Sequence, residues 1–184
     1  GNRIPDIIIF INGLPLVVFE CKSPLLTNPL QQGIRQVIEY QETIPKLFYL
    51  NQIIIVTSSQ SAVYGVLGNS YNNFQIWKDP YPITLDQLEK IVERTGRTTQ
   101  DPTPQDILLY GLLEKRNLLD LIRNFIIFET SRGKLYKKIA RYQQFRATNK
   151  TLTRILTEKD SELRGGTIWH TQGSGKSLTM LFTS

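Results

Sequence analysis

PDIIIFINGLPLVVFECKSP, residues 5–24, decides the fold, because two apolar runs flank the pair Asn12-Gly13. Each run is rich in isoleucine, valine, leucine and phenylalanine with little alternation, which predicts strands that are covered on both faces. Asn-Gly between apolar runs is the strongest short-range signal for a β-hairpin. A hairpin brings the outer ends of the stretch together, so Asp6 approaches Glu20.

The length of the hairpin loop decides whether these two carboxylates share a face of the sheet. A two-residue turn places Asp6 opposite Phe19, and its side chain then leaves on the face away from Glu20. A three-residue loop that ends at a left-handed Gly13 moves Asp6 by one position. Because side chains alternate along a strand, Asp6 then shares a face with Glu20 and Lys22. We therefore expect this odd loop or an equivalent bulge.

Two neighbouring carboxylates repel each other unless a proton or a divalent cation lies between them. Oxygen ligands with open positions suit Mg²⁺, which keeps several waters and accepts phosphate oxygens from a substrate. A nearby lysine stabilises the charge that develops at a phosphodiester. Asp6, Glu20 and Lys22 are therefore predicted to be catalytic residues of a metal-dependent phosphodiester hydrolase. The alternative is a strand that ends in solvent, the usual explanation of a lone Glu-x-Lys.

This pattern resembles the PD-(D/E)xK nuclease superfamily, with Pro5-Asp6 as the first element and Glu20-Cys21-Lys22 as the second. The resemblance implies an α/β fold in which a mixed sheet is flanked by helices. It also implies a metal that is bound by Asp6, Glu20 and the backbone carbonyl of Cys21.

A further feature of such nucleases lies on the helix predicted at residues 30–44, where Gln36 and Tyr40 form a Q-x-x-x-Y motif. Positions four apart lie on one helical face, so both side chains can point toward one site. The resemblance implies that the pair borders the catalytic centre and helps to position DNA. Glutamine and tyrosine at this spacing also occur by chance on surface helices.

The composition is that of a globular chain of 184 residues, 40% hydrophobic and 21% charged. No apolar run is long enough to span a bilayer, and the start shows no signal-peptide pattern. One cysteine excludes an internal disulfide and fits a cytoplasmic location. A net charge of +6 and a pI near 9.5 favour an anionic partner, nucleic acid before membrane.

Prolines and changes of period divide the chain into three parts. Residues 1–80 are predicted to be the nuclease domain, residues 81–133 a helical linker, and residues 134–184 the start of a RecA-like helicase or translocase domain. Strands beyond the hairpin are predicted at residues 50–58, 62–67 and 73–77, the first of them a buried parallel strand. Helices of the linker are predicted at residues 84–96, with Thr84 and Gln87 as a capping box, and at 104–115 and 118–128.

Basic residues accumulate toward the end of the chain, interleaved with aromatic side chains. They could contact nucleic acid, but a solvated helix face is the commoner explanation of such a run. The run comprises Arg132, Lys134, Lys137, Lys138, Arg141, Arg146, Lys150 and Arg154.

YQQFRA, residues 142–147, resembles the Q motif that precedes the phosphate loop of superfamily 2 helicases. In those proteins a glutamine of this motif hydrogen-bonds adenine. Adjacency to Tyr142 favours Gln143 for the role, and spacing to Ala147 favours Gln144. We assign it to Gln144.

GGTIWHTQGSGKSLTMLFTS, residues 165–184, predicts a short strand, a glycine-rich loop and the start of a helix, which is the setting of a Walker A motif. Glycines let backbone N–H groups converge on phosphate oxygens, and the helix N-terminus adds a favourable partial charge. Lys176 is predicted to reach the terminal phosphates of ATP, and Ser177 to ligate the accompanying Mg²⁺. His170 replaces the first glycine of the motif. The residues assigned to nucleotide binding in this loop are Gly173, Ser174, Gly175, Lys176 and Ser177.

A nuclease pattern followed by this phosphate loop resembles the restriction (R) subunit of type I restriction-modification enzymes. The stretches that resemble sequences of this family are residues 12–24, 74–78, 139–147 and 167–180. The resemblance implies Mg²⁺-dependent endonucleolytic cleavage of double-stranded DNA, coupled to ATP-driven translocation. It also implies a bacterial or archaeal complex with methylation (M) and specificity (S) subunits.

Two alternatives stay open. An ATP-dependent DNA-repair helicase with a RecB-like nuclease domain would carry both sites, although its nuclease generally follows its motor. A non-catalytic DNA- or nucleotide-binding module would carry a decayed site. Because the chain starts without methionine and ends just after the phosphate loop, we expect a piece that lacks the first elements of the nuclease core. We also expect that it does not hydrolyse ATP by itself.

Overall fold

The computed structural model describes residues 3–96 and 101–184. The predicted hairpin is formed by β1 (Ile7–Ile11) and β2 (Leu14–Cys21), which pair antiparallel. Asn12 and Gly13 join the two strands with φ angles of 50° and 81°. Two successive positive φ angles are characteristic of the tight hairpin turn that Asn-Gly favours, because this turn matches the twist of the strands.

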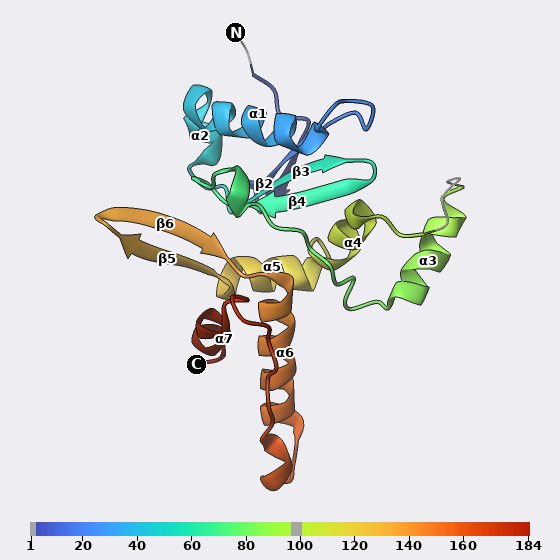
Figure 1. Ribbon diagram of the computed structural model, residues 1–184, viewed down its shortest axis with the longest axis vertical. Helices are drawn as coiled ribbons and strands as arrows, with labels where there is room; N and C mark the ends of the chain where they lie inside the picture. Colours follow the sequence, from blue (N-terminus) through green and yellow to red (C-terminus); the bar gives the residue numbers. More distant parts are fainter. Residues whose placement is uncertain (1–2, 97–100) are drawn as a thin grey trace.

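A four-stranded mixed sheet follows from this hairpin, in the order β1-β2-β3-β4 (Figure 1). β3 (Ile53–Ser58) lies parallel to β2, and β4 (Ser61–Gly65) lies antiparallel to β3. A parallel pair needs a crossover, which α1 (Pro29–Thr43) and the short α2 (Pro45–Phe48) supply. The predicted order of hairpin, helix and parallel strand is confirmed.

Both faces of the sheet are covered at its inner strands β2 and β3. The prediction of coverage on both faces is wrong for β1, which lies at the edge of the sheet and leaves Ile7 and Phe10 exposed. On β3, Ile54 and Val56 face α1, whereas Ile53 and Ile55 face a second core that includes side chains of the later helices. Figure 1 shows α1 on one side of the sheet and the later helices on the other. Every residue of β3 is buried, which explains why its sequence shows no polar alternation.

The strand predicted at residues 73–77 reduces to an isolated bridge between Gln75 and Tyr64. Trp77 is 1% exposed, and its Nε1 donates to the Asp79 carbonyl at 2.7 Å. Burial of this large ring with its N–H satisfied directs the chain into the core instead of along the sheet edge.

Three helices follow. The predicted capping box is confirmed, since Gln87 N donates to Thr84 Oγ1 at 3.3 Å and Thr84 N donates to Gln87 Oε1 at 2.9 Å. The second helix is shorter than predicted because the Glu114 carboxylate accepts backbone N–H groups and so caps the third. The bounds are Leu85–Arg94 for α3, Pro104–Gly111 for α4 and Lys115–Asn124 for α5.

The prediction that the last linker helix extends to Phe128 is wrong, because β5 (Ile126–Ser131) and β6 (Lys134–Ile139) form a second hairpin. Arg132 and Gly133 join these strands with φ angles of 49° and 74°. Apolar β-branched residues before this turn favour strands. The expected boundary between the second and third parts of the chain falls on this turn, inside one hydrogen-bonded unit. Part of the basic run therefore lies on a strand, not on a helix face.

Helix α6 (Tyr142–Thr157) and α7 (Lys176–Thr183) complete the chain. The short strand predicted before the glycine-rich loop is not formed, because residues 165–170 find no pairing strand in the described part of the chain. No helix of residues 3–96 and 101–184 combines the length and apolarity needed to cross a membrane.

Candidate functional site

A bulge brings Asp6 and Glu20 to one face of the first hairpin. The turn has two residues, but Leu16 is an extra residue on β2, so that Ile8 pairs with Val18 further along. Asp6 and Glu20 lie two residues beyond this pair toward the open end, and alternation places them on the same face. The expected three-residue loop is not formed, and the bulge that was its stated equivalent is confirmed. It gives Asp6 and Glu20 their common face.

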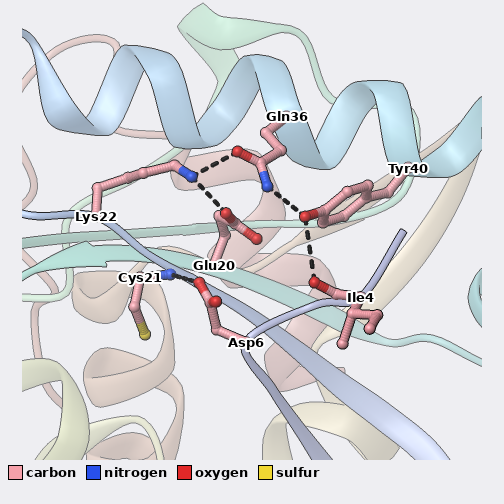
Figure 2. Close-up of polar contacts among 7 residues, drawn as sticks. All are labelled: Ile4, Asp6, Glu20, Cys21, Lys22, Gln36 and Tyr40. Carbon is pink, nitrogen blue, oxygen red and sulfur yellow. Dashed lines mark hydrogen bonds and ion pairs between the residues drawn. The ribbon is translucent and has the colours of Figure 1, made fainter. Parts of the chain in front are cut away.

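Lys22 connects the end of β2 to helix α1 (Figure 2). Its Nζ donates to Glu20 Oε1 at 2.5 Å and to the side-chain oxygen of Gln36. Gln36 donates through Nε2 to the Tyr40 hydroxyl, which donates to the Ile4 carbonyl at 3.4 Å. The residues of the Q-x-x-x-Y motif and of the Glu-x-Lys motif are therefore joined by continuous hydrogen bonds.

Asp6 lies at the edge of this group, where its Oδ2 accepts from the backbone N of Cys21 at 2.7 Å (Figure 2). This bond fixes the Cys21 peptide beside both carboxylates. Desolvation raises the pKa of the Cys21 thiol, and the charges of Asp6 and Glu20 raise it further. The thiol therefore stays protonated near neutral pH, which leaves the backbone as the part of Cys21 suited to binding a hard cation.

Glu20 is a buried carboxylate with only 1% of its surface exposed. Burial raises its pKa above the usual value, the hydrogen bond and charge of Lys22 oppose this, and the Asp6 charge adds to it. The Tyr40 hydroxyl is close enough to lower the pKa of Glu20, yet it donates to the Ile4 carbonyl. Glu20 Oε2 has no hydrogen-bond partner in the described part of the chain. Such an atom is costly to bury unless a ligand meets it.

The donor atoms that Asp6, Glu20 and Cys21 offer are of the chemical kind that suits a small divalent cation. Asp6 and Glu20 offer carboxylate oxygens and Cys21 a backbone carbonyl, which are the hard donors that Mg²⁺ prefers. Residues 3–96 and 101–184 contain no cluster of three or more His, Cys, Asp or Glu side chains arranged to hold a metal. A cation held by two carboxylates would keep several water ligands, as Mg²⁺ commonly does, so the site is open to a substrate.

Helix α1 approaches the strand ends at Gly33. A Cβ there would lie 2.4 Å from Val56 Cγ1 and 3.3 Å from Lys22 Cγ. Gly33→Ala is therefore expected to displace the helix and lower the free energy of unfolding by about 1–3 kcal/mol. Thermal unfolding measures this change, with Gly165→Ala as the control because nothing lies within 4 Å of its added Cβ. Since alanine is the better helix former, an unchanged Tm for Gly33→Ala would contradict the close packing.

The glycine-rich loop has the backbone shape that a phosphate loop requires. Gly173 and Gly175 have φ angles of 77° and 85°, in the region that favours glycine. Helix α7 begins at Lys176 with no side-chain cap. The N–H groups of Leu178 and Thr179 donate to the Gly175 carbonyl, whereas those of Lys176 and Ser177 precede the first intrahelical bonds and can meet an anion. Lys176 and Ser177 are exposed and Ser174 is buried. The structure brings all five predicted loop residues together.

Gln144 supports this loop from inside the protein. It is 2% exposed, and its Nε2 donates to the carbonyls of Gly175 at 3.0 Å and Ser174 at 3.3 Å. Its Oε1 accepts from the backbone N of Arg141 at 2.8 Å. Both polar atoms of the Gln144 amide are thus occupied by the protein, which is at odds with the adenine contact assigned to this residue.

Gln143 is placed differently. Its Oε1 is buried and has no hydrogen-bond partner within the described ranges. The side chain lines a cavity of about 570 Å³ together with Trp169 and His170, which lie just before the glycine-rich loop. Adjacency to Tyr142 was the sequence signal for Gln143. The signal against Gln144 is its place three residues after the N-cap of α6, from which its side-chain oxygen reaches back to the backbone N of Arg141.

Two protein families match separate parts of the chain. Residues 1–73 match the family described as Type I restriction enzyme R protein N terminus, and residues 143–184 match the SWI2/SNF2 ATPase family. Over 99% of its length the chain is 42% identical to the type I restriction enzyme HindI endonuclease subunit of Haemophilus influenzae. Over 98% of its length it is 34% identical to a putative type I restriction enzyme MjaIXP endonuclease subunit of Methanocaldococcus jannaschii.

A mixed α/β domain followed by helices and the beginning of a SWI2/SNF2-type ATPase region defines the class of protein. The chain belongs to the family of type I restriction enzyme endonuclease (R) subunits, to which it is homologous along almost its whole length. It spans 17% of the Haemophilus relative and 18% of the Methanocaldococcus relative.

Proposed function

We propose that this chain carries the nuclease centre of the R subunit of a type I restriction-modification enzyme, followed by the first part of its motor. The reaction is Mg²⁺-dependent endonucleolytic cleavage of double-stranded DNA, coupled to ATP-driven translocation. The observation that carries the proposal is the unpartnered, buried oxygen of Glu20, beside Asp6 and bonded through its other oxygen to Lys22. A purely structural ion pair is expected to satisfy its buried polar atoms.

Each residue of the centre has a separate task. Asp6, Glu20 and the Cys21 carbonyl would hold the cation, which when bound neutralises phosphodiester charge and lowers the pKa of a water. The Nζ of Lys22 is held between Glu20 and Gln36, and its ammonium stabilises negative charge that develops on the phosphate. The Q-x-x-x-Y pair on α1 keeps that ammonium in place.

The second site is proposed to bind ATP. Lys176 would meet its terminal phosphates, and Ser177 would ligate the Mg²⁺ that accompanies the nucleotide. We propose that Gln143 contacts adenine, because it has a free amide oxygen beside a cavity. Gln144 holds the loop in shape. The SWI2/SNF2 ATPase match over residues 143–184 supports nucleotide use at this site.

The finer organisation is also a proposal. The order of hairpin, helix and parallel strand supports a PD-(D/E)xK core over residues 1–80. The linker and the start of the RecA-like domain are proposed to meet after residue 139, and not at 133, so that the β5–β6 hairpin stays whole. We also propose assembly with M and S subunits in the cytoplasm, on double-stranded DNA. The relatives are named as endonuclease subunits of type I restriction enzymes, which supports a role as one subunit of such a complex.

Two observations favour this proposal over the alternatives. The nuclease pattern precedes the phosphate loop, whereas a repair helicase with a RecB-like domain generally has the opposite order. The hydrogen bonds that join Lys22 to Glu20 and Gln36 argue against a decayed, non-catalytic site.

Asp6→Asn in the complete protein, assembled with its partner subunits, tests the proposed function. The change removes one carboxylate charge at constant size, so DNA cutting should fall by more than the roughly 10–100-fold that loss of an outer-shell partner costs. Asp86→Asn is the matched control, because Asp86 is an exposed carboxylate in the first turn of α3. Cutting by Asp6→Asn at the wild-type rate would overturn the assignment.

A further inference from the structure

A hollow of about 630 Å³ opens from the nuclease site along helix α1. Lys22 and Gln36 line both the hollow and the site, so the two are continuous. Leu26 is the one apolar side chain among the hollow's lining residues. The chemistry of the wall therefore suits a polar ligand that extends beyond the cutting position.

The cationic side chains that line this hollow differ in whether they already form an ion pair. Arg3 forms an ion pair with Glu39, and Lys22 forms one with Glu20. Arg35 also lines the hollow and is exposed. Within residues 3–96 and 101–184 its guanidinium makes no hydrogen bond or ion pair. Arg35 is thus a cationic side chain of the hollow that has no acidic partner among the described residues.

Arg35 is well placed to meet a strand that leaves the nuclease site. It directly precedes Gln36 on α1, and like Gln31 it lines both the hollow and a smaller one of about 240 Å³. Each DNA strand carries a phosphate charge about every 3.4 Å along the helix axis. A strand whose phosphate lies at Lys22 must therefore bring neighbouring phosphates past this helix face or away from the protein.

We propose that Arg35 binds a backbone phosphate that neighbours the scissile one, and that the hollow beside α1 is the track of that DNA strand. This inference rests on the nuclease function proposed above. The planar guanidinium offers paired donors that match phosphate oxygens. Such a contact positions the strand and reads no bases. Arg35 is a positioning residue for the cut.

The test compares Arg35→Ala with Arg35→Lys and with Arg94→Ala in the complete protein and its complex. Arg94 is a matched control, since it is also an exposed helical arginine but lies on α3, away from α1 (Figure 1). DNA cutting is measured against salt concentration, with ATP hydrolysis in the same samples. Because Ala is a good helix former at this exposed position, the fold should be kept.

Arg35→Ala is expected to slow cutting about 10–100-fold without changing ATP hydrolysis, as for a lost charged hydrogen bond. The slope of log rate against log salt should fall by about one, the contribution of one phosphate contact, whereas Arg35→Lys should keep the wild-type slope. Arg94→Ala should behave as wild type. Wild-type rate and slope in Arg35→Ala would overturn the inference, and so would a reduced slope in Arg35→Lys.

Asp6→Asn, measured in the same experiment, separates failure of the DNA-track inference from failure of the proposed nuclease function. Loss of cutting in Asp6→Asn with wild-type cutting in Arg35→Ala would overturn the DNA track alone. Wild-type cutting in Asp6→Asn would overturn the nuclease centre, and the track with it.

Discussion

Lys22→Ala is expected to stop DNA cutting while ATP hydrolysis continues. The ammonium of Lys22 is the group that stabilises charge on the phosphate, and loss of one such donor costs about 10²–10³-fold in rate. The change also removes the hydrogen bond and the charge of Lys22, which are the two larger causes that lower the pKa of Glu20. The pKa of Glu20 should then rise further, so any remaining cutting should recover as the pH is raised.

The measurement is cleavage of double-stranded DNA and release of phosphate from ATP in one reaction mixture. Lys46→Ala is the matched control, because Lys46 is an exposed lysine on α2 with no bonded partner in the described residues. Cutting by Lys22→Ala at the rate of Lys46→Ala would contradict the assigned role. Loss of ATP hydrolysis in Lys22→Ala would contradict the separation of the two sites.

Lys176→Ala is expected to abolish ATP hydrolysis, and with it every cut that depends on translocation. Lys176 is exposed at the first position of α7, so its loss should leave the fold intact and remove the cation that meets the terminal phosphates. By analogy with other preorganised charges the rate should fall about 10²–10³-fold.

Nucleotide hydrolysis is compared in Lys176→Ala and in Lys159→Ala, which removes an exposed lysine between α6 and the loop. Lys159→Ala should match the wild type. Full ATP hydrolysis in Lys176→Ala would show that the glycine-rich loop is not the nucleotide site. The two large effects differ in kind, because Lys22→Ala should affect cutting alone whereas Lys176→Ala should affect both activities.

The first hairpin shows which structural features local sequence predicts and which it does not. Asn12-Gly13 predicts the turn, because both residues readily adopt positive φ. The need for a common face of Asp6 and Glu20 predicts that an extra residue must occur somewhere. Its position at Leu16 could not be predicted, since a bulge is selected by how the sheet packs around it and not by any residue signal in the strand.

The sequence pattern does not predict the β5–β6 hairpin, for a related reason. A run such as LLDLIRNFIIF, residues 118–128, carries apolar residues that suit a helix or a strand, and short apolar runs cannot be separated by period alone. The turn lies at Arg132-Gly133, where the sequence pattern indicates only the start of a basic run. Residues 165–170 show the opposite error, because the sequence predicts a strand and the structure has none. A strand needs a neighbouring strand with which to pair, and the described residues do not provide one.

The nucleotide site shows why a motif's members are harder to assign than the motif. Gln143 and Gln144 are equivalent in composition and adjacent in sequence. Their difference arises because α6 starts at Tyr142, which turns Gln144 inward to the loop carbonyls and leaves Gln143 beside a cavity. The helix boundary therefore sets the different surroundings of the two residues, and boundaries are what local sequence determines least well. Which of the two contacts adenine stays a prediction.

The raised pKa of Glu20 links the protonation of this residue to binding of the proposed cation. Its pKa is raised by burial, so the charged carboxylate is disfavoured in the folded protein until a cation meets it. Divalent cation binding should therefore weaken as the pH falls through this raised pKa, because the carboxylate must lose its proton to bind. The same cation should restore the charged form at a lower pH than in its absence.

Mn²⁺ binding to the complete protein, measured by isothermal titration calorimetry without nucleotide or DNA, tests the central claim most directly. The account predicts one site that Lys176→Ala keeps, because Ser177 needs the nucleotide to hold a cation, and that Glu20→Gln loses at unchanged side-chain size. Equal Mn²⁺ binding by Glu20→Gln and the wild type would contradict it.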